Sequence, residues 1–132
     1  MDKKRIAVYI YSKNSKKQLE CLLRIISKYP NWELEVVYID TSFACPEFQQ
    51  LKEACREGKL DLVLTKTVKQ FGKNLIQTMN AIQELHRLKP SVGVYFEKEN
   101  LFTGGEGNLK TLMYIHNMFI NNSEQKYAAA NV

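Results

Sequence analysis

Cysteine, proline and histidine are scarce in this sequence, and their scarcity excludes several classes of protein. The 132 residues include three cysteines, three prolines and two histidines. An odd number of cysteines without C-x-x-C spacing predicts neither a disulfide framework nor a zinc site, and makes the cytoplasm the simplest location. His86 and His116 have no acidic or cysteine ligand at metal-binding spacing. We therefore expect no metal and no cofactor.

Long apolar runs and nucleotide-binding glycine motifs are also missing. No stretch reaches the ~18 apolar residues that cross a bilayer, and the N-terminus lacks the apolar segment of a signal peptide. The GGEG sequence at residues 104–107 has neither the lysine of a P-loop nor the spacing of a dinucleotide fingerprint. We expect a flexible loop there, and no membrane partner for the chain.

The composition is that of one folded domain with an excess of positive charge. Hydrophobic residues make up 45% of the chain and charged residues 25%, which is typical of globular proteins. We expect one domain over residues 1–125, followed by a frayed tail at 126–132. The formal net charge of +5 favours a polyanionic partner, although lysine runs also occur on ordinary solvated surfaces.

Apolar segments of strand length alternate with segments of helical periodicity. The expected strands lie at residues 6–11, 34–39, 62–64 and 92–96. The expected helices lie between Leu19 and Pro30, between Pro46 and Gly58, between Leu75 and Pro90, and after Asn108. This order predicts an α/β domain with a mostly parallel sheet of four or more strands and helices on both faces. The first strand is apolar on both faces, so we expect it in the interior of the sheet.

A basic corner follows the third expected strand. Residues 62–64 are apolar without alternation, which suits a strand buried on both faces. Ligands of open α/β sheets bind beyond the carboxyl ends of the strands, so Lys66, Lys69, Gln70 and Lys73 are expected where an anion could be held. A solvated basic loop would explain the same residues.

Hydroxyl and amine groups are the remaining candidates for chemistry. Asp40 closes the second expected strand, but no second acid closes the first or third, which argues against receiver-type phosphotransfer. Ser12, Lys13 and Ser15 follow the first strand, with Lys16 as a further candidate phosphate ligand. A hydroxyl among fixed cations suits nucleophilic attack on a phosphodiester, because the cations stabilise charge on the phosphoryl oxygens.

The last expected helix carries a broad apolar strip, and no strand follows to bury it. The strip consists of Leu112, Ile115, Met118 and Phe119. Two interpretations stay open: the strip is a contact between copies in a homodimer or tetramer, or it packs on the chain's own sheet.

Three segments, in this order, resemble the N-terminal catalytic domain of the resolvase/invertase family of serine site-specific recombinases. They are NWELEVVYID, PEFQQLKEACREGKLDLVLTKTVKQFGKN and NLKTLMYIHNMF, and the resemblance spans residues 5–125. It implies a serine that attacks a DNA phosphate to form a covalent 5′-phosphoserine link. It also implies strand exchange in a tetramer that forms through a long last helix.

The resemblance leaves two registers open after the first strand, where the family reads Tyr-x-Arg-x-Ser. With Tyr11 on the family's tyrosine, Ser15 is the nucleophile and Lys13 replaces the arginine. With Tyr9 on that tyrosine, Tyr11 takes the place of the arginine and Lys13 that of the serine. The second register leaves no nucleophile.

Other positions depart from the family pattern in ways that weaken phosphate binding. The resemblance places Gln70 and Lys73 on arginines, Lys69 on an aspartate or serine, and Cys45 on the arginine that precedes a proline. Lysine is a point charge without the guanidinium fork, and glutamine and cysteine carry no charge. Losing one preorganised donor commonly costs roughly 100-fold to 1000-fold in rate. Strand transfer is therefore expected to be weakened or lost.

Two other classes of function remain open. One is a noncatalytic interaction module that keeps the fold and dimerises. The other is a small-molecule-binding domain, which would require a preformed pocket at the strand ends lined by more than lysines. Because no helix-turn-helix, zinc ribbon or basic arm follows the last helix, DNA binding is expected to be weak, salt-sensitive and independent of sequence.

Overall fold

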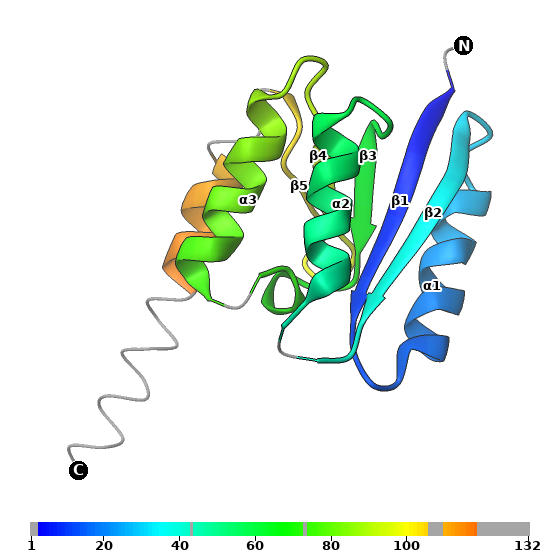
Figure 1. Ribbon diagram of the computed structural model, residues 1–132, viewed down its shortest axis with the longest axis horizontal. Helices are drawn as coiled ribbons and strands as arrows, with labels where there is room; N and C mark the ends of the chain where they lie inside the picture. Colours follow the sequence, from blue (N-terminus) through cyan, green and yellow to red (C-terminus); the bar gives the residue numbers. More distant parts are fainter. Residues whose placement is uncertain (1–2, 43, 73, 106–109, 119–132) are drawn as a thin grey trace.

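The computed structural model describes residues 3–42, 44–72, 74–105 and 110–118 (Figure 1). Its elements are β1 (Lys4–Tyr11), α1 (Ser15–Ser27), β2 (Trp32–Asp40), α2 (Pro46–Arg56), β3 (Leu62–Thr65), the 3-10 helix η1 (Val68–Gln70), α3 (Leu75–Arg87), β4 (Gly93–Phe96) and β5 (Leu101–Phe102). Residues 110–118 form a further helical segment. The expected tail at 126–132 and the expected N-cap Asn108 lie outside the described residues.

The strands form one five-stranded sheet in the order β2-β1-β3-β4-β5. The first four strands are parallel, and β5 pairs antiparallel with β4. The prediction of a mostly parallel α/β sheet is confirmed, and so is the interior position of β1, which pairs with β2 on one side and β3 on the other. The sequence did not predict β5 or η1, which are only two and three residues long.

The two faces of the sheet bury different side chains of β1, because successive residues of a strand point to opposite faces. Ala7 and Tyr9 belong to a core shared with α2, α3 and the 110–118 segment. Ile6, Val8 and Ile10 belong to a second core, shared with α1. Helices therefore cover both faces, as predicted, and Figure 1 shows α2 and α3 on one side and α1 on the other.

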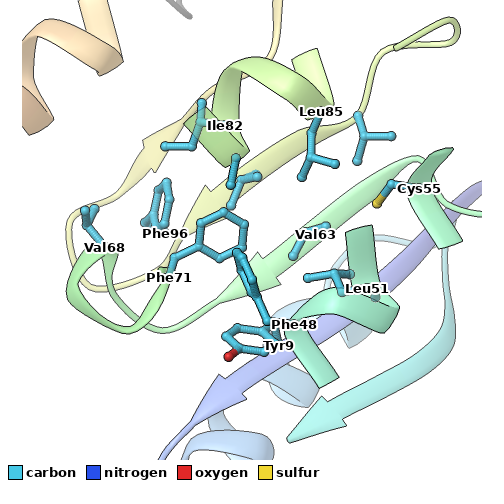
Figure 2. Close-up of a cluster of buried hydrophobic side chains, with 14 of the residues drawn as sticks. Tyr9, Phe48, Leu51, Cys55, Val63, Val68, Phe71, Ile82, Leu85 and Phe96 are labelled. Atoms are coloured by element: carbon cyan, nitrogen blue, oxygen red, sulfur yellow. The ribbon is translucent and has the colours of Figure 1, made fainter. Parts of the chain in front are cut away.

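A chain of aromatic rings runs through the larger core (Figure 2). Tyr9 meets Phe48 edge to face with ring centroids 5.1 Å apart. Phe48 meets Phe71 at 5.0 Å, and Phe71 meets Phe96 at 5.7 Å, in the same geometry. Such contacts stabilise by about 1 kcal/mol each beyond the area they bury. They join β1, α2, the segment after η1 and β4 into one unit.

The last described helical segment packs on the chain's own fold. Leu112 and Ile115 are buried in the core with α3, and Met118 packs against that core. This corrects the interpretation of Leu112 and Ile115 as an exposed contact strip, because burial against the sheet removes them from the surface. Phe119, the fourth residue of that strip, lies outside the described residues, and the long last helix that the sequence suggests is not confirmed.

An ion pair between Arg5, near the start of β1, and Asp61, just before β3, joins the amino ends of these two neighbouring strands. Asp61 accepts hydrogen bonds from the Arg5 backbone N–H at 2.8 Å and from the Arg5 guanidinium at 3.1 and 3.2 Å. The pKa of Asp61 is lowered, chiefly by the hydrogen bond from the Arg5 side chain. The carboxylate therefore favours the folded state only while it is ionised.

We predict that Asp61→Asn destabilises the protein in a pH-dependent way. A depressed folded-state pKa contributes stability above the unfolded value, near ~3.9, and loses it as the pH falls through the folded value. Urea unfolding of both proteins should therefore differ by about 1 kcal/mol or less at pH 7, because the pair is partly exposed, and the difference should vanish as the pH falls through the lowered pKa of Asp61.

Glu33→Gln is the control, because Glu33 contacts Lys3 only at the surface, at 3.8 Å. It should shift stability little at any pH. A difference between wild type and Asp61→Asn that is constant from pH 7 to pH 3 would contradict the pairing.

Candidate functional site

The carboxyl ends of β1, β2 and β3 point to the same end of the molecule, where α1 and α2 begin and η1 lies (Figure 1). A buried aspartate at the end of β2 organises this edge. Asp40 is 2% exposed and accepts a hydrogen bond from the Tyr9 hydroxyl at 2.9 Å. It also accepts hydrogen bonds from the backbone N–H groups of Glu47 and Phe48, both at 2.9 Å. One carboxylate thus joins β1, β2 and α2.

Asp40 caps α2 from outside the helix. The N-cap residue, Cys45, makes no capping hydrogen bond with its side chain and has a left-handed backbone with φ of 49°. Pro46 follows at the first helical position, where a missing N–H is harmless. The next two N–H groups lack acceptors within the helix, and Asp40 accepts from both. A negative charge at a helix N-terminus is also favoured by the helix dipole.

Tyr9 has a structural role at this edge. Burial raises the pKa of its phenol, and the hydrogen bond to Asp40 raises it further. The phenol therefore stays protonated and donates to the carboxylate. Its side chain is 1% exposed, so it offers no surface to a substrate.

A cleft of about 440 Å³ opens beside this anchor, between α2 and α3. Its walls come from four parts of the chain: Tyr11 at the end of β1; Cys45, Phe48, Gln49 and Lys52 in and before α2; Lys69, Gln70 and Gly72 in and after η1; and Gln77, Asn80, Ala81 and Glu84 on α3. The cleft lies at the strand ends, where the sequence predicts a site, and is lined by more than lysines.

Gly72 allows the floor of the cleft to form. Its φ is 99°, and a Cβ atom there would lie 2.7 Å from the Thr78 hydroxyl oxygen. That hydroxyl donates a hydrogen bond to the carbonyl of Phe71. Gly72 therefore lets the segment after η1 approach the first turn of α3, which brings the two walls together.

Among the described residues, the cleft includes two of the candidate catalytic and phosphate-binding residues, together with Tyr11 and Cys45, which the resemblance places on arginines. Lys69 and Gln70 line it, whereas Ser12, Lys13 and Ser15 are not among its described lining residues. Ser15 is the first residue of α1, and the Ser12 hydroxyl accepts a hydrogen bond from the Asn14 backbone N–H at 3.1 Å.

Two other candidate phosphate ligands, Lys66 and Lys16, are also not in the described lining of the cleft. Lys66 forms an ion pair with Glu97 at 2.7 Å, and its Nζ lies 3.7 Å from the Cys21 Sγ. The hydrogen bond to Glu97 raises the pKa of Lys66, so the amine stays charged but that charge is already matched. Lys16 is exposed on α1, and Lys73 lies outside the described residues.

Sequence reasoning missed the polar residues of the two helices. Gln49 and Lys52 are three residues apart on α2, and Gln77 and Asn80 are three apart on α3. Each spacing places both side chains on one helix face. The sequence therefore shows that each helix has a pair of polar residues on one face. It does not show that these two faces lie opposite each other across a cleft.

Neither a metal cluster nor a membrane span is found in the described parts of the chain. Histidine, cysteine, aspartate and glutamate do not gather there in groups of three that could hold a metal ion. The helices of residues 3–42, 44–72, 74–105 and 110–118 include none that is long and apolar enough to span a bilayer.

Compared by sequence, the chain matches no protein-family model and no curated protein. Solved structures with the same fold do match. The N-terminal catalytic domain of the TP901-1 integrase has a TM-score of 0.72 and 17% identity, over 94% of this chain and 98% of that one. A resolvase family site-specific recombinase from Streptococcus pneumoniae has a TM-score of 0.62 and 16% identity, over 96% and 99%.

A third solved structure extends the likeness. The C-terminal catalytic domain of ISC1926 TnpA, an IS607-like serine recombinase, has a TM-score of 0.55 and 12% identity, over 93% of this chain and 85% of that one. The chain therefore has the fold of serine recombinase catalytic domains. At these identities, the likeness concerns the fold and leaves the chemistry to be argued from the residues of the site.

We predict that the Asp40 anchor contributes more to stability than any single partner. Asp40→Asn should lower the free energy of unfolding by about 3 kcal/mol, because it removes a buried charge that satisfies three donors. Tyr9→Phe should lower it by about 1 kcal/mol, because it removes one of those hydrogen bonds. Urea unfolding at pH 7 measures both changes.

Glu47→Gln is the matched control, because it removes a charge from the same turn and leaves the backbone N–H to Asp40 intact. It should change stability by less than about 0.5 kcal/mol. If Tyr9→Phe destabilised the protein as much as Asp40→Asn, the capping of α2 by Asp40 would be the weaker part of the anchor, contrary to this account.

Proposed function

We propose that this chain is a serine-recombinase-like DNA-handling domain in which strand cleavage is lost or strongly weakened. Likeness of fold to an integrase catalytic domain, a resolvase family recombinase and a serine recombinase catalytic domain supports the first part. The make-up of the cleft supports the second. It brings Tyr11, Cys45 and Gln70 together, and no serine or threonine is among its described lining residues.

This grouping favours one of the two registers that the resemblance leaves open. With Tyr9 on the family's tyrosine, Tyr11, Cys45 and Gln70 all stand on arginines. Three phosphate ligands of one site should lie around one cleft, and these three positions do. In this register Lys13 takes the place of the nucleophilic serine. The proposal is therefore that the phosphate site has lost the three arginines at these positions and its nucleophile.

Loss of these groups removes the main sources of rate acceleration. Phosphoryl transfer by a serine needs a hydroxyl in line with the phosphorus and fixed cations on the phosphoryl oxygens. Of the described residues in the predicted basic corner after β3, Lys69 is the charged one that lines the cleft. The ammonium groups of Lys69 and Lys52 attract a phosphate without the fork of a guanidinium to fix its orientation.

DNA remains the proposed partner, and the cytoplasm the proposed location. The chain has a net charge of +5, and Lys52 and Lys69 form no ion pair with the described residues. We also propose that the chain associates with a second copy of itself. Because Leu112 and Ile115 are buried in the core, no surface is assigned to this contact. The proposal predicts that sedimentation velocity of the full chain at micromolar concentration shows a dimer.

We predict that incubation with supercoiled DNA yields no covalent protein–DNA adduct. The assay is denaturing electrophoresis of radiolabelled plasmid, with a fused DNA-binding domain and its cognate site to ensure occupancy. Ser12→Ala, Ser15→Ala and Tyr11→Phe are run in parallel, because these residues carry the candidate hydroxyl groups. An adduct that disappears in Ser15→Ala would overturn the proposal and establish the other register. An adduct that disappears in Tyr11→Phe would show a tyrosine nucleophile and would equally overturn it.

We predict that duplex DNA binds weakly, with affinity that falls as salt rises and is the same for unrelated sequences. Fluorescence anisotropy between 25 and 200 mM salt is the measurement. Lys69→Met should reduce the slope of log affinity against log salt by about one unit, because one phosphate contact is lost. Lys66→Met is the matched control, since Glu97 already offsets that charge. An equal effect of both variants, or strong preference for one duplex, would contradict the assignment.

A further inference from the structure

The cleft between α2 and α3 is large enough to enclose a small molecule. Its volume of about 440 Å³ lies within the range of small-molecule sites, roughly 300–1,000 Å³. Both of its walls are helices. The N-terminus of α2 donates hydrogen bonds to Asp40, and the first turn of α3 packs closely against Gly72. The cleft is therefore preformed, whereas a surface that only contacts a DNA backbone needs no cleft.

Carboxamides are the most numerous polar groups in the described lining. Gln49 comes from α2, Gln70 from η1, and Gln77 and Asn80 from α3. Each carboxamide offers an acceptor oxygen and two donor hydrogens. The edge of a nucleobase presents the same alternation of donors and acceptors, which is why asparagine and glutamine pair with bases. A phosphate alone would have no use for the acceptor oxygens.

One of these carboxamides has unmet hydrogen-bonding capacity. The Gln70 Oε1 atom is buried and has no hydrogen-bond partner among the described residues. A buried acceptor without a donor costs about 1–3 kcal/mol. Rotation of the side chain toward the cleft would allow a ligand N–H to satisfy it. The ligand should therefore carry a hydrogen-bond donor near η1.

The charges of the cleft favour an anionic group on the same ligand. Lys52 and Lys69 line it and form no ion pair with the described residues. Its acidic residue, Glu84, is already paired with Arg56 at 2.5 Å. The uncompensated charge is therefore positive. Apolar surface comes from Tyr11 and Ala81, and the Tyr11 ring can contact the face of a base.

We propose that this cleft binds a nucleotide, with the carboxamides on the base and the two lysines on the 5′-phosphate. The nucleotide is either free or the unstacked end of a DNA strand, because both present a base and a phosphate at the same spacing. This binding requires no serine nucleophile and involves no covalent step. It therefore goes beyond the proposed DNA-handling function and can succeed or fail independently of strand cleavage.

The test is a titration of the full chain with the four 2′-deoxynucleoside 5′-monophosphates. Binding is measured by calorimetry, and the residues involved by amide shifts in two-dimensional NMR spectra. At least one monophosphate should bind saturably and shift the amides of Gln70 and Asn80. Deoxyadenosine and inorganic phosphate each supply half of the ligand, and each should bind at least about tenfold more weakly.

Exposed positions allow the test without disturbing the fold. Lys69→Met should weaken binding of the monophosphate about tenfold by removing a charged contact, and Asn80→Leu should weaken it several-fold by removing a carboxamide. Lys17→Met, an exposed lysine on α1, is the matched control and should bind like wild type. Amide spectra of each variant verify the fold.

A 5′-phosphorylated single-stranded dodecamer distinguishes the two sources of the nucleotide. Tighter binding of the dodecamer than of any monophosphate, with the same loss in Asn80→Leu, assigns the cleft to a DNA end. Tighter binding of a monophosphate assigns it to a free nucleotide. Binding unchanged by Lys69→Met and Asn80→Leu, or no saturable binding of either probe, overturns the proposal whatever the result of the cleavage assay.

Discussion

The hydrogen bonds of one buried carboxylate hold together the carboxyl ends of β1 and β2 and the start of α2, on which the site depends. Asp40 lies at the end of β2, accepts from Tyr9 on the neighbouring β1, and accepts from the first N–H groups of α2. Without such an acceptor, the N-terminus of α2 would have unpaired donors at a buried position. Because α2 forms one wall of the cleft, the same carboxylate that stabilises the fold also fixes the shape of the site.

The fold and the chemistry of this chain are separable. The aromatic contacts, the parallel sheet and the capped helix need buried apolar groups and one acid, and all are present. Phosphodiester cleavage by a serine would need that hydroxyl and an array of fixed cations around the cleft. The described lining holds two lysines, four carboxamides, a thiol and a phenol, and no serine. The fold therefore does not decide which chemistry the groups at the strand ends perform, and that chemistry has to be argued from the residues of the cleft.

The strands and helices were predictable because their signals are local. The apolar run of β1 and the helical spacing of Leu22 and Ile26 predict their elements without tertiary information. The site was less predictable, because it depends on which helix faces meet. Lys66 and Lys69 are three residues apart, yet Glu97 pairs with the first while the second lines the cleft. Nor could the sequence show that Asp40, which matched no catalytic pattern, caps a helix that begins six residues later.

Native-state hydrogen exchange of the Glu47 and Phe48 amides tests the role of Asp40 most directly. These N–H groups have no acceptor within α2, so without the carboxylate they would exchange at nearly the rate of an unstructured chain. The account predicts that both exchange at least about a thousandfold more slowly than that rate, and that protection falls sharply in Asp40→Asn. Exchange within about tenfold of the unstructured rate in the wild-type protein would contradict the claim that Asp40 anchors α2 and shapes the cleft.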